Sequence, residues 1–204
     1  MPHEPHRSHV QSAWLVSLQS VVWTVLASCI AVTLGVASGS AVLGAFGAIG
    51  FVDALGSIAL VYHFRHALRH EALSEQLERL AHRVVVVGLF TVGTGAVVVG
   101  IARLAAGSTG QSSNAGIALA AISLVALIAL SARKQSLARH VGSDALLADG
   151  RLSGVGALQA GVTLFGTAAA RGFDWNWADP VAASLVGIVA ITVAIGTISR
   201  AKNA

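Results

Sequence analysis

Six long apolar segments constrain this chain more than any other feature of its sequence. The helices predicted from them cover residues 13–37, 41–64, 84–106, 115–132, 143–170 and 181–199. Each can cross the hydrocarbon core of a bilayer, which takes about 20 helical residues. Only 11% of the residues are charged and the mean hydropathy is +0.75, which excludes a soluble domain. The sequence predicts an all-α, six-helix transmembrane bundle.

The remaining residues leave little room for anything else. Residues 1–12 are expected to form a flexible tail that contains histidines, and residues 200–204 a short C-terminal tail. The first apolar segment is too long for a cleaved signal peptide, so we interpret it as a spanning helix. The sequence therefore predicts one membrane domain with a short tail at each end.

The basic residues predict how the bundle lies in the membrane. Ten of the 13 Lys and Arg residues fall at one set of predicted helix ends: Arg7, Arg65, Arg69, Arg79, Arg83, Arg133, Lys134, Arg139, Arg200 and Lys202. Because cytoplasmic loops carry an excess of Lys and Arg, both termini are expected in the cytoplasm and the protein in the cell membrane. The isoelectric point near 10.2 then reflects topology, and nucleic-acid binding is not expected.

Two carboxylates inside or beside the apolar segments are the strongest functional candidates. Asp53 lies near the middle of the second segment, with Ser57 one helical turn later, and Asp149 has the same relation to Ser153. A charge in lipid costs about 2.5 to 3.5 kcal/mol on insertion scales, so it usually marks a site that faces protein or water. Oxygen ligands of this kind suit divalent cations. The alternative is a structural role, with Asp149 paired to a cation such as Arg151.

Histidines form a second, weaker signal. Three of them recur in the N-terminal tail, and three cluster where the second helix leaves the membrane: His63, His66 and His70. Neutral imidazole binds zinc and neighbouring metals, so this cluster is a candidate for collecting metal at the cytoplasmic mouth. Solvated polypeptide is the alternative interpretation for the tail.

Three motifs in the same order resemble those of the cation diffusion facilitator (cation efflux) family. They are the second-helix stretch Gly-Phe-Val-Asp-Ala-Leu-Gly-Ser at 50–57, the stretch Ser-Asp-Ala-Leu-Leu-Ala-Asp-Gly at 143–150, and Trp-Ala-Asp-Pro-Val-Ala-Ala at 177–183. The resemblance covers nearly the whole chain. It implies six helices with both termini inside, a homodimer, and a metal site between the second and fifth helices.

The chain departs from the family pattern at three ligand positions. Ser57 replaces the second carboxylate of the second helix, and Leu152 and Gly156 occupy the fifth-helix ligand positions. The chain resembles short members that lack the cytoplasmic domain. Asp149 is then the candidate for the second carboxylate, and Ser57 and Ser153 are weaker oxygen donors.

The function expected from this resemblance is export of a divalent cation, zinc or another transition metal, in exchange for protons. The cation is substrate, and no permanently bound cofactor is expected. The alternative is a non-transporting regulatory or interaction subunit with a degenerate site. An enzyme is not expected: the metalloprotease motif HExxH fails at Ser74, and no histidine follows His140 to serve an intramembrane serine protease.

Overall fold

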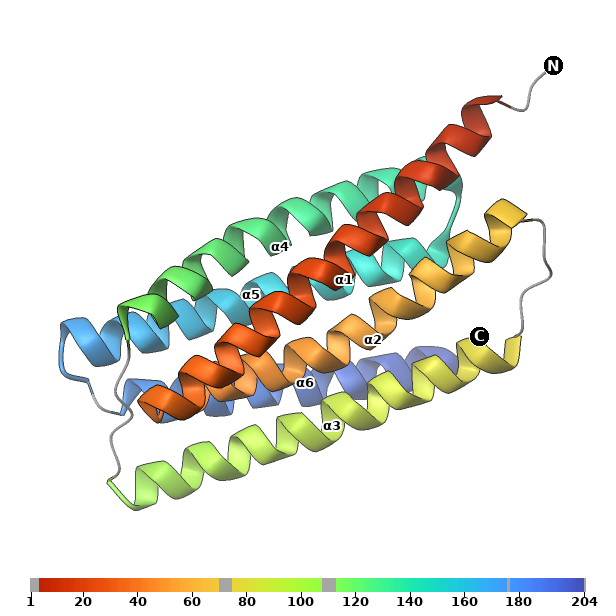
Figure 1. Ribbon diagram of the computed structural model, residues 1–204. Helices are drawn as coiled ribbons and strands as arrows, with labels where there is room; N and C mark the ends of the chain where they lie inside the picture. Colours follow the sequence, from red (N-terminus) through yellow and green to blue (C-terminus); the bar gives the residue numbers. More distant parts are fainter. Residues whose placement is uncertain (1–3, 70–74, 108–112, 176, 204) are drawn as a thin grey trace.

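The computed structural model describes residues 4–69, 75–107, 113–175 and 177–203, and these residues form six α-helices (Figure 1). The helices are α1 (Glu4–Ser38), α2 (Ala41–Arg69), α3 (Glu75–Ala105), α4 (Asn114–Val141), α5 (Asp144–Gly172) and α6 (Ala178–Asn203). Each is long and apolar enough to cross a membrane. The prediction of an all-α chain with six helices that are each able to span a membrane is confirmed.

Helix α2 is the central element of the bundle. It packs against α1, α3, α5 and α6, while α4 packs mainly on α5 and α3 mainly on α6. The helices run along one common axis, and the start of α1 and the end of α6 lie at the same end of the molecule (Figure 1). A chain with an even number of antiparallel helices has both ends on the same side of the bundle. Which side of the membrane holds that end stays a prediction.

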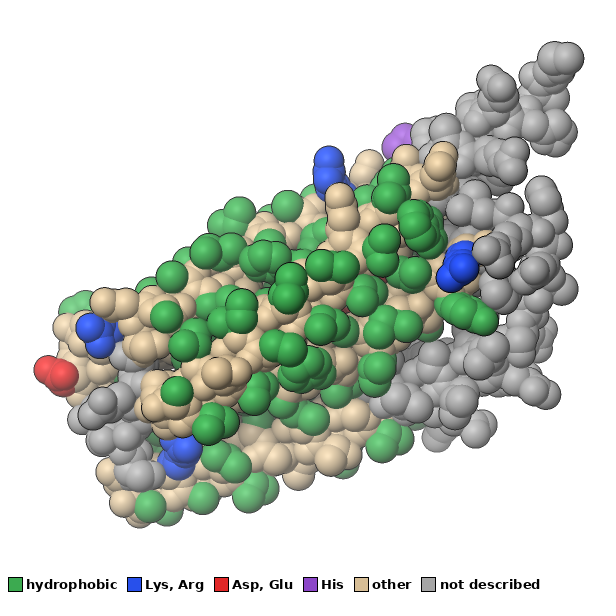
Figure 2. Space-filling model, in the orientation of Figure 1, with side chains coloured by type: hydrophobic (Ala, Val, Ile, Leu, Met, Phe, Trp, Pro, Cys, Tyr) green, Lys and Arg blue, Asp and Glu red, His purple; other side chains and the backbone are tan. Residues whose placement is uncertain are grey.

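The surface has the character of a membrane domain. Hydrophobic side chains cover the middle of the face shown in Figure 2, and the coloured charged side chains lie toward its two ends. Each of the six helices carries a large apolar side chain that is more than half exposed: Val22, Tyr62, Val87, Val125, Phe165 and Ile188. Lipid tails would cover such side chains at no cost, whereas water would not.

The turn between α4 and α5 is fixed by two adjacent residues. Gly142 ends α4 with φ of 69°, a left-handed conformation that glycine adopts without strain. Ser143 follows as the N-cap of α5, and its hydroxyl accepts a hydrogen bond from the backbone N–H of Leu146. This turn therefore holds α4 and α5 antiparallel and sets where Asp149 enters the bundle.

A fully buried carboxylate fixes the opposite end of the bundle. Asp179, in the first turn of α6, accepts a hydrogen bond from the backbone N–H of Ala41 at 2.8 Å and a second one from the hydroxyl of Ser40. Arg103 of α3 donates to the backbone carbonyl of Gly39 in the same α1–α2 turn. These bonds tie the turn to α3 and α6.

Several helices are longer than the sequence predicted. Helix α1 begins at Glu4 instead of residue 13, and α6 continues to Asn203, so most of each expected tail is helical. Helix α4 runs nine residues past its expected end at residue 132. Its extra turns bury Ala138 against three residues of other helices: Ala13, Leu60 and Leu146. This packing offsets the cost of extending the helix, and it carries Lys134 into the bundle.

Candidate functional site

The polar centre of the bundle is built around Lys134. Its side chain is fully buried, and Nζ lies 2.6 Å from Oδ2 of Asp149. The ammonium also donates hydrogen bonds to the hydroxyls of Ser20 at 2.7 Å, Ser153 at 2.9 Å and Ser57 at 3.3 Å. The buried ammonium therefore has one ion pair and three hydroxyl partners, which is the condition for burying a charge at tolerable cost.

Four helices contribute to this centre. Ser20 comes from α1, Ser57 from α2, Lys134 from α4, and both Asp149 and Ser153 from α5. The hydroxyl of Ser57 also donates to Oδ1 of Asp149 at 3.0 Å, so both carboxylate oxygens of Asp149 are engaged. The structure thus brings together three of the four residues expected at the metal site. It groups them around a lysine.

The prediction that Lys134 lies just past the end of the fourth helix was wrong. The neighbouring Arg133 is exposed, and the pair looked like the end of a helix. In the structure α4 continues, and Ser131, Lys134 and Ala138 share its buried face at spacings of three and four residues. That periodicity could have identified Lys134 as a buried residue, because the same face of the helix continues to Ala138, beyond the basic pair Arg133 and Lys134.

Asp149 has a different partner from the one considered in the sequence. Arg151 is exposed, whereas Lys134 is buried against Asp149. Gly150 allows this approach, since a Cβ there would lie 3.0 Å from Cβ of Lys134 and 2.9 Å from Cγ of Gln135. The close contact of α4 with α5 is therefore part of what positions the ion pair.

Asp53 lies beside this centre and has no equivalent partner. Its side chain is only 9% exposed, and Oδ1 makes no hydrogen bond within the part of the chain that the structure describes. The charges of Asp149 and Lys134 both act on it. With all three groups ionised, the centre carries one uncompensated negative charge. A buried charge of this kind is costly, and it is the feature that a bound cation would correct.

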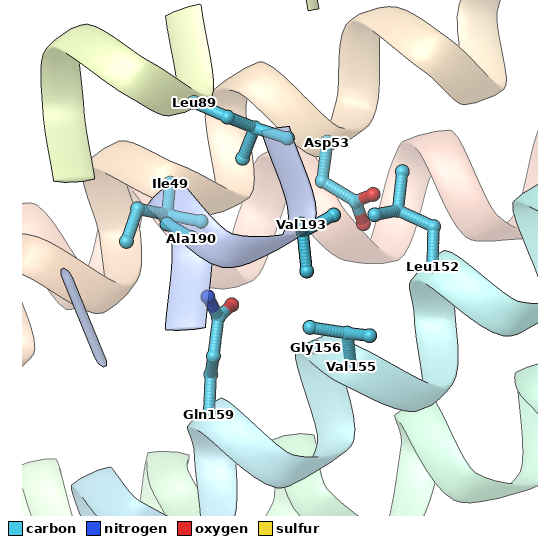
Figure 3. A pocket seen from close by; sticks show the side chains of 9 residues that line it. All are labelled: Ile49, Asp53, Leu89, Leu152, Val155, Gly156, Gln159, Ala190 and Val193. Carbon is cyan, nitrogen blue, oxygen red and sulfur yellow. The ribbon is translucent and has the colours of Figure 1, made fainter. Parts of the chain in front are cut away.

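A small cavity adjoins Asp53 (Figure 3). It offers about 10 Å³ to the centre of a water molecule, roughly what one water requires. Asp53 and Gln159 reach toward it from α2 and α5, and Leu152 and Gly156 line it between them. The cavity therefore includes both α5 positions at which the family resemblance places metal ligands. Here those positions are apolar, and Gln159, one turn further along α5, is the other polar residue that lines the cavity.

The ammonium of Lys134 already occupies the oxygens at the centre of this arrangement. Among the residues whose placement is described, no group of three or more His, Cys, Asp or Glu side chains lies close enough to hold a metal ion. The oxygens of Asp149, Ser57 and Ser153 already contact Lys134. A metal ion could use these oxygens only if the ammonium left.

The expected histidine cluster cannot be located. The side chains of His63 and His66 belong to α2 but lie outside the described part of the structure, as does residue His70 altogether. Their role in collecting metal stays a prediction.

The comparisons with known proteins add no assignment. No protein-family model matches the chain, and a search of curated proteins finds no match. The likeness to cation diffusion facilitators therefore rests on the three sequence motifs. The homodimer stays a prediction on the same basis.

Proposed function

We propose that this chain is a membrane transporter that exchanges a cation for protons at the centre formed by Asp53, Lys134 and Asp149. The observation that carries the proposal is the buried ammonium of Lys134, held among oxygen atoms from four helices. Ionisable groups within spanning helices are expensive, and they commonly mark ion pathways and proton relays. The oxygens that now hold the ammonium of Lys134 could hold a metal cation in its place.

Charge balance supports a divalent cation as cargo. With Lys134 in place the centre has two carboxylates and one ammonium. A divalent cation between Asp53 and Asp149 would be neutralised by these two carboxylates once the ammonium had moved away or lost its proton. The oxygens of Ser57 and Ser153, released by Lys134, and the amide oxygen of Gln159 would complete the shell. When Lys134 loses its proton, one proton leaves the centre for each metal ion bound, and this would link cation export to proton entry.

The helix contacts support a bundle whose halves can move. Helices α3 and α6 touch through their backbones, because a Cβ added at Gly93 would lie 2.9 Å from the carbonyl oxygen of Gly187. Small residues allow close packing without interlocked side chains. Rocking of one group of helices against the other around a buried site is the usual route to alternating access.

The direct test measures metal-driven proton movement in proteoliposomes. The purified chain is reconstituted with an internal pH dye, and zinc, manganese and cobalt are added outside in turn. We expect at least one metal to produce a pH change, and Asp53→Asn to abolish it while the protein remains folded. Asp174→Asn removes a carboxylate from an exposed residue and serves as the control. Normal flux in Asp53→Asn would refute the assignment of this residue.

The second candidate is a non-transporting membrane subunit that uses the ion pair only to hold the bundle together. The small size of the cavity and the apolar residues Leu152 and Gly156 favour it. This candidate requires that no cation produces flux, and that replacing both Lys134 and Asp149 with apolar residues leaves a stable protein. Flux that disappears in Asp53→Asn excludes it.

A further inference from the structure

An open groove runs along the outer surface of α4 and α5, away from the central site. It has a volume of about 560 Å³. Its lining changes from apolar to polar and then basic along α4, and it comprises Ile128, Ser131, Ala132, Gln135, Ser136, Arg139 and His140 of α4 with Gly154 and Ala157 of α5. None of these lining residues is acidic.

The position of the groove along α4 relates it to the bilayer. Ile128 lies beside the midpoint of the helix Asn114–Val141, and Arg139 lies eleven residues further on. At 1.5 Å per residue this separation is about 16 Å, close to half the ~30 Å hydrocarbon thickness. With the midpoint of α4 at the bilayer centre, the groove would extend from the middle of the membrane to the level of the lipid headgroups.

The polar part of the groove is held by hydrogen bonds within the protein, and its remaining polar atoms face outward. Gln135 donates one hydrogen bond to Ser131 at 3.0 Å, and Ser131 donates to the carbonyl of Gly150 at 2.8 Å. Ser136 is exposed, and its carbonyl contacts Nδ1 of His140 at 2.7 Å. Polar atoms at such a surface are stabilised by a ligand that brings its own polar atoms to the same depth.

We propose that this groove binds one anionic phospholipid. Its phosphate would contact Arg139, its glycerol and ester oxygens would lie near Gln135 and Ser136, and one acyl chain would lie along Ile128 and Ala132. A guanidinium binds phosphate with paired hydrogen bonds, and basic pockets between membrane helices recognise anionic headgroups. The gradient of the groove from apolar to basic matches the gradient of a phospholipid from tail to headgroup.

A second copy of this chain fits the groove less well. In a twofold dimer the same surface faces itself, so the Arg139 residues of the two copies would be drawn into one interface with no acidic residue in the groove to neutralise them. A lipid phosphate supplies the missing charge.

The lipid site would lie behind the central ion pair. Ser131, which lines the groove, donates a hydrogen bond to the carbonyl of Gly150, and these two residues are close in sequence to Lys134 and Asp149 on the same two helices. A lipid in the groove would therefore hold together the two helix turns that carry the ion pair. The proposal of a lipid site does not depend on the proposed transport function.

The test is native mass spectrometry of the full chain in detergent, with phosphatidylglycerol or phosphatidylcholine of identical acyl chains added. We expect one phosphatidylglycerol to be retained per chain and phosphatidylcholine to be lost. Arg139→Gln should weaken retention about fivefold, the effect of one basic residue near a membrane surface. Ala132→Trp, which fills the groove without changing charge, should abolish retention. Arg133→Gln removes the same charge from an exposed position of α4 outside the groove and should have no effect.

Three results would overturn the proposal. Equal retention of the two lipids would exclude recognition of an anionic headgroup. Displacement of phosphatidylglycerol by glycerol phosphate alone would show that a free phosphate compound suffices. Dissociation of a dimer by Ala132→Trp, with lipid retention unchanged, would assign the groove to contact between two copies of this chain.

Discussion

Removing the ammonium of Lys134 should destabilise the bundle strongly. In Lys134→Met the carboxylate of Asp149 stays buried but loses its 2.6 Å ion pair, and three serine hydroxyls lose a donor. Loss of one partner from a buried pair costs about 3 to 5 kcal/mol, because the other charge remains without compensation. We expect the free energy of unfolding to fall by about this amount.

A double variant separates the energy of the ion pair from the cost of leaving one buried charge without a partner. Lys134→Met combined with Asp149→Leu removes both charges, and replacing a buried pair by apolar groups is often neutral or stabilising. We therefore expect the double variant to recover most of the loss. Each single variant alone should be much less stable than the double.

The assay is reversible unfolding in mixed micelles or by steric trapping in bicelles, applied as a double-mutant cycle. Arg133→Met is the matched control, since it removes a cation from the adjacent, exposed position of α4. The reasoning fails if Lys134→Met unfolds with the same free energy as the original protein. It also fails if the double variant is as unstable as the sum of the two single variants, because the two side chains would then be uncoupled.

Three further predictions concern the geometry of the bundle, and thermal unfolding in lipid nanodiscs can test each. Asp179→Ala leaves the buried N–H of Ala41 without an acceptor and should cost about 1 to 3 kcal/mol, whereas Asp179→Asn keeps an oxygen acceptor and should cost less. Gly35→Ala places a methyl group 2.6 Å from the backbone nitrogen of Gly44 and should cost about 1 to 3 kcal/mol by separating α1 from α2; an unchanged melting temperature would contradict this packing. Gly142→Ala has open space around the new methyl group but must adopt φ of 69°, so its cost of about 1 kcal/mol should come from the backbone alone, and Gly142→Asn should recover part of it.

The sequence alone determined the class of fold and part of the site. Apolar segments long enough to span a bilayer leave the backbone no alternative to helices, since every N–H and C=O must be paired within the segment. Helical spacing also put Ser57 on the face of Asp53, and Ser153 on the face of Asp149. Local periodicity is enough for such inferences because it depends only on residues within a few turns of one helix.

The tertiary structure determined which residues of other helices contact those faces. Lys134 belongs to α4, and its partners belong to three other helices, so no pattern within one segment could pair it with Asp149. The contact requires the antiparallel turn at Gly142, the extension of α4 past residue 132, and the absence of a side chain at Gly150. A buried ammonium is tolerable only where several oxygens converge, and only the packing of four helices brings those oxygens together. The same packing leaves Asp53 beside the ion pair, buried and without a partner for Oδ1 among the described residues.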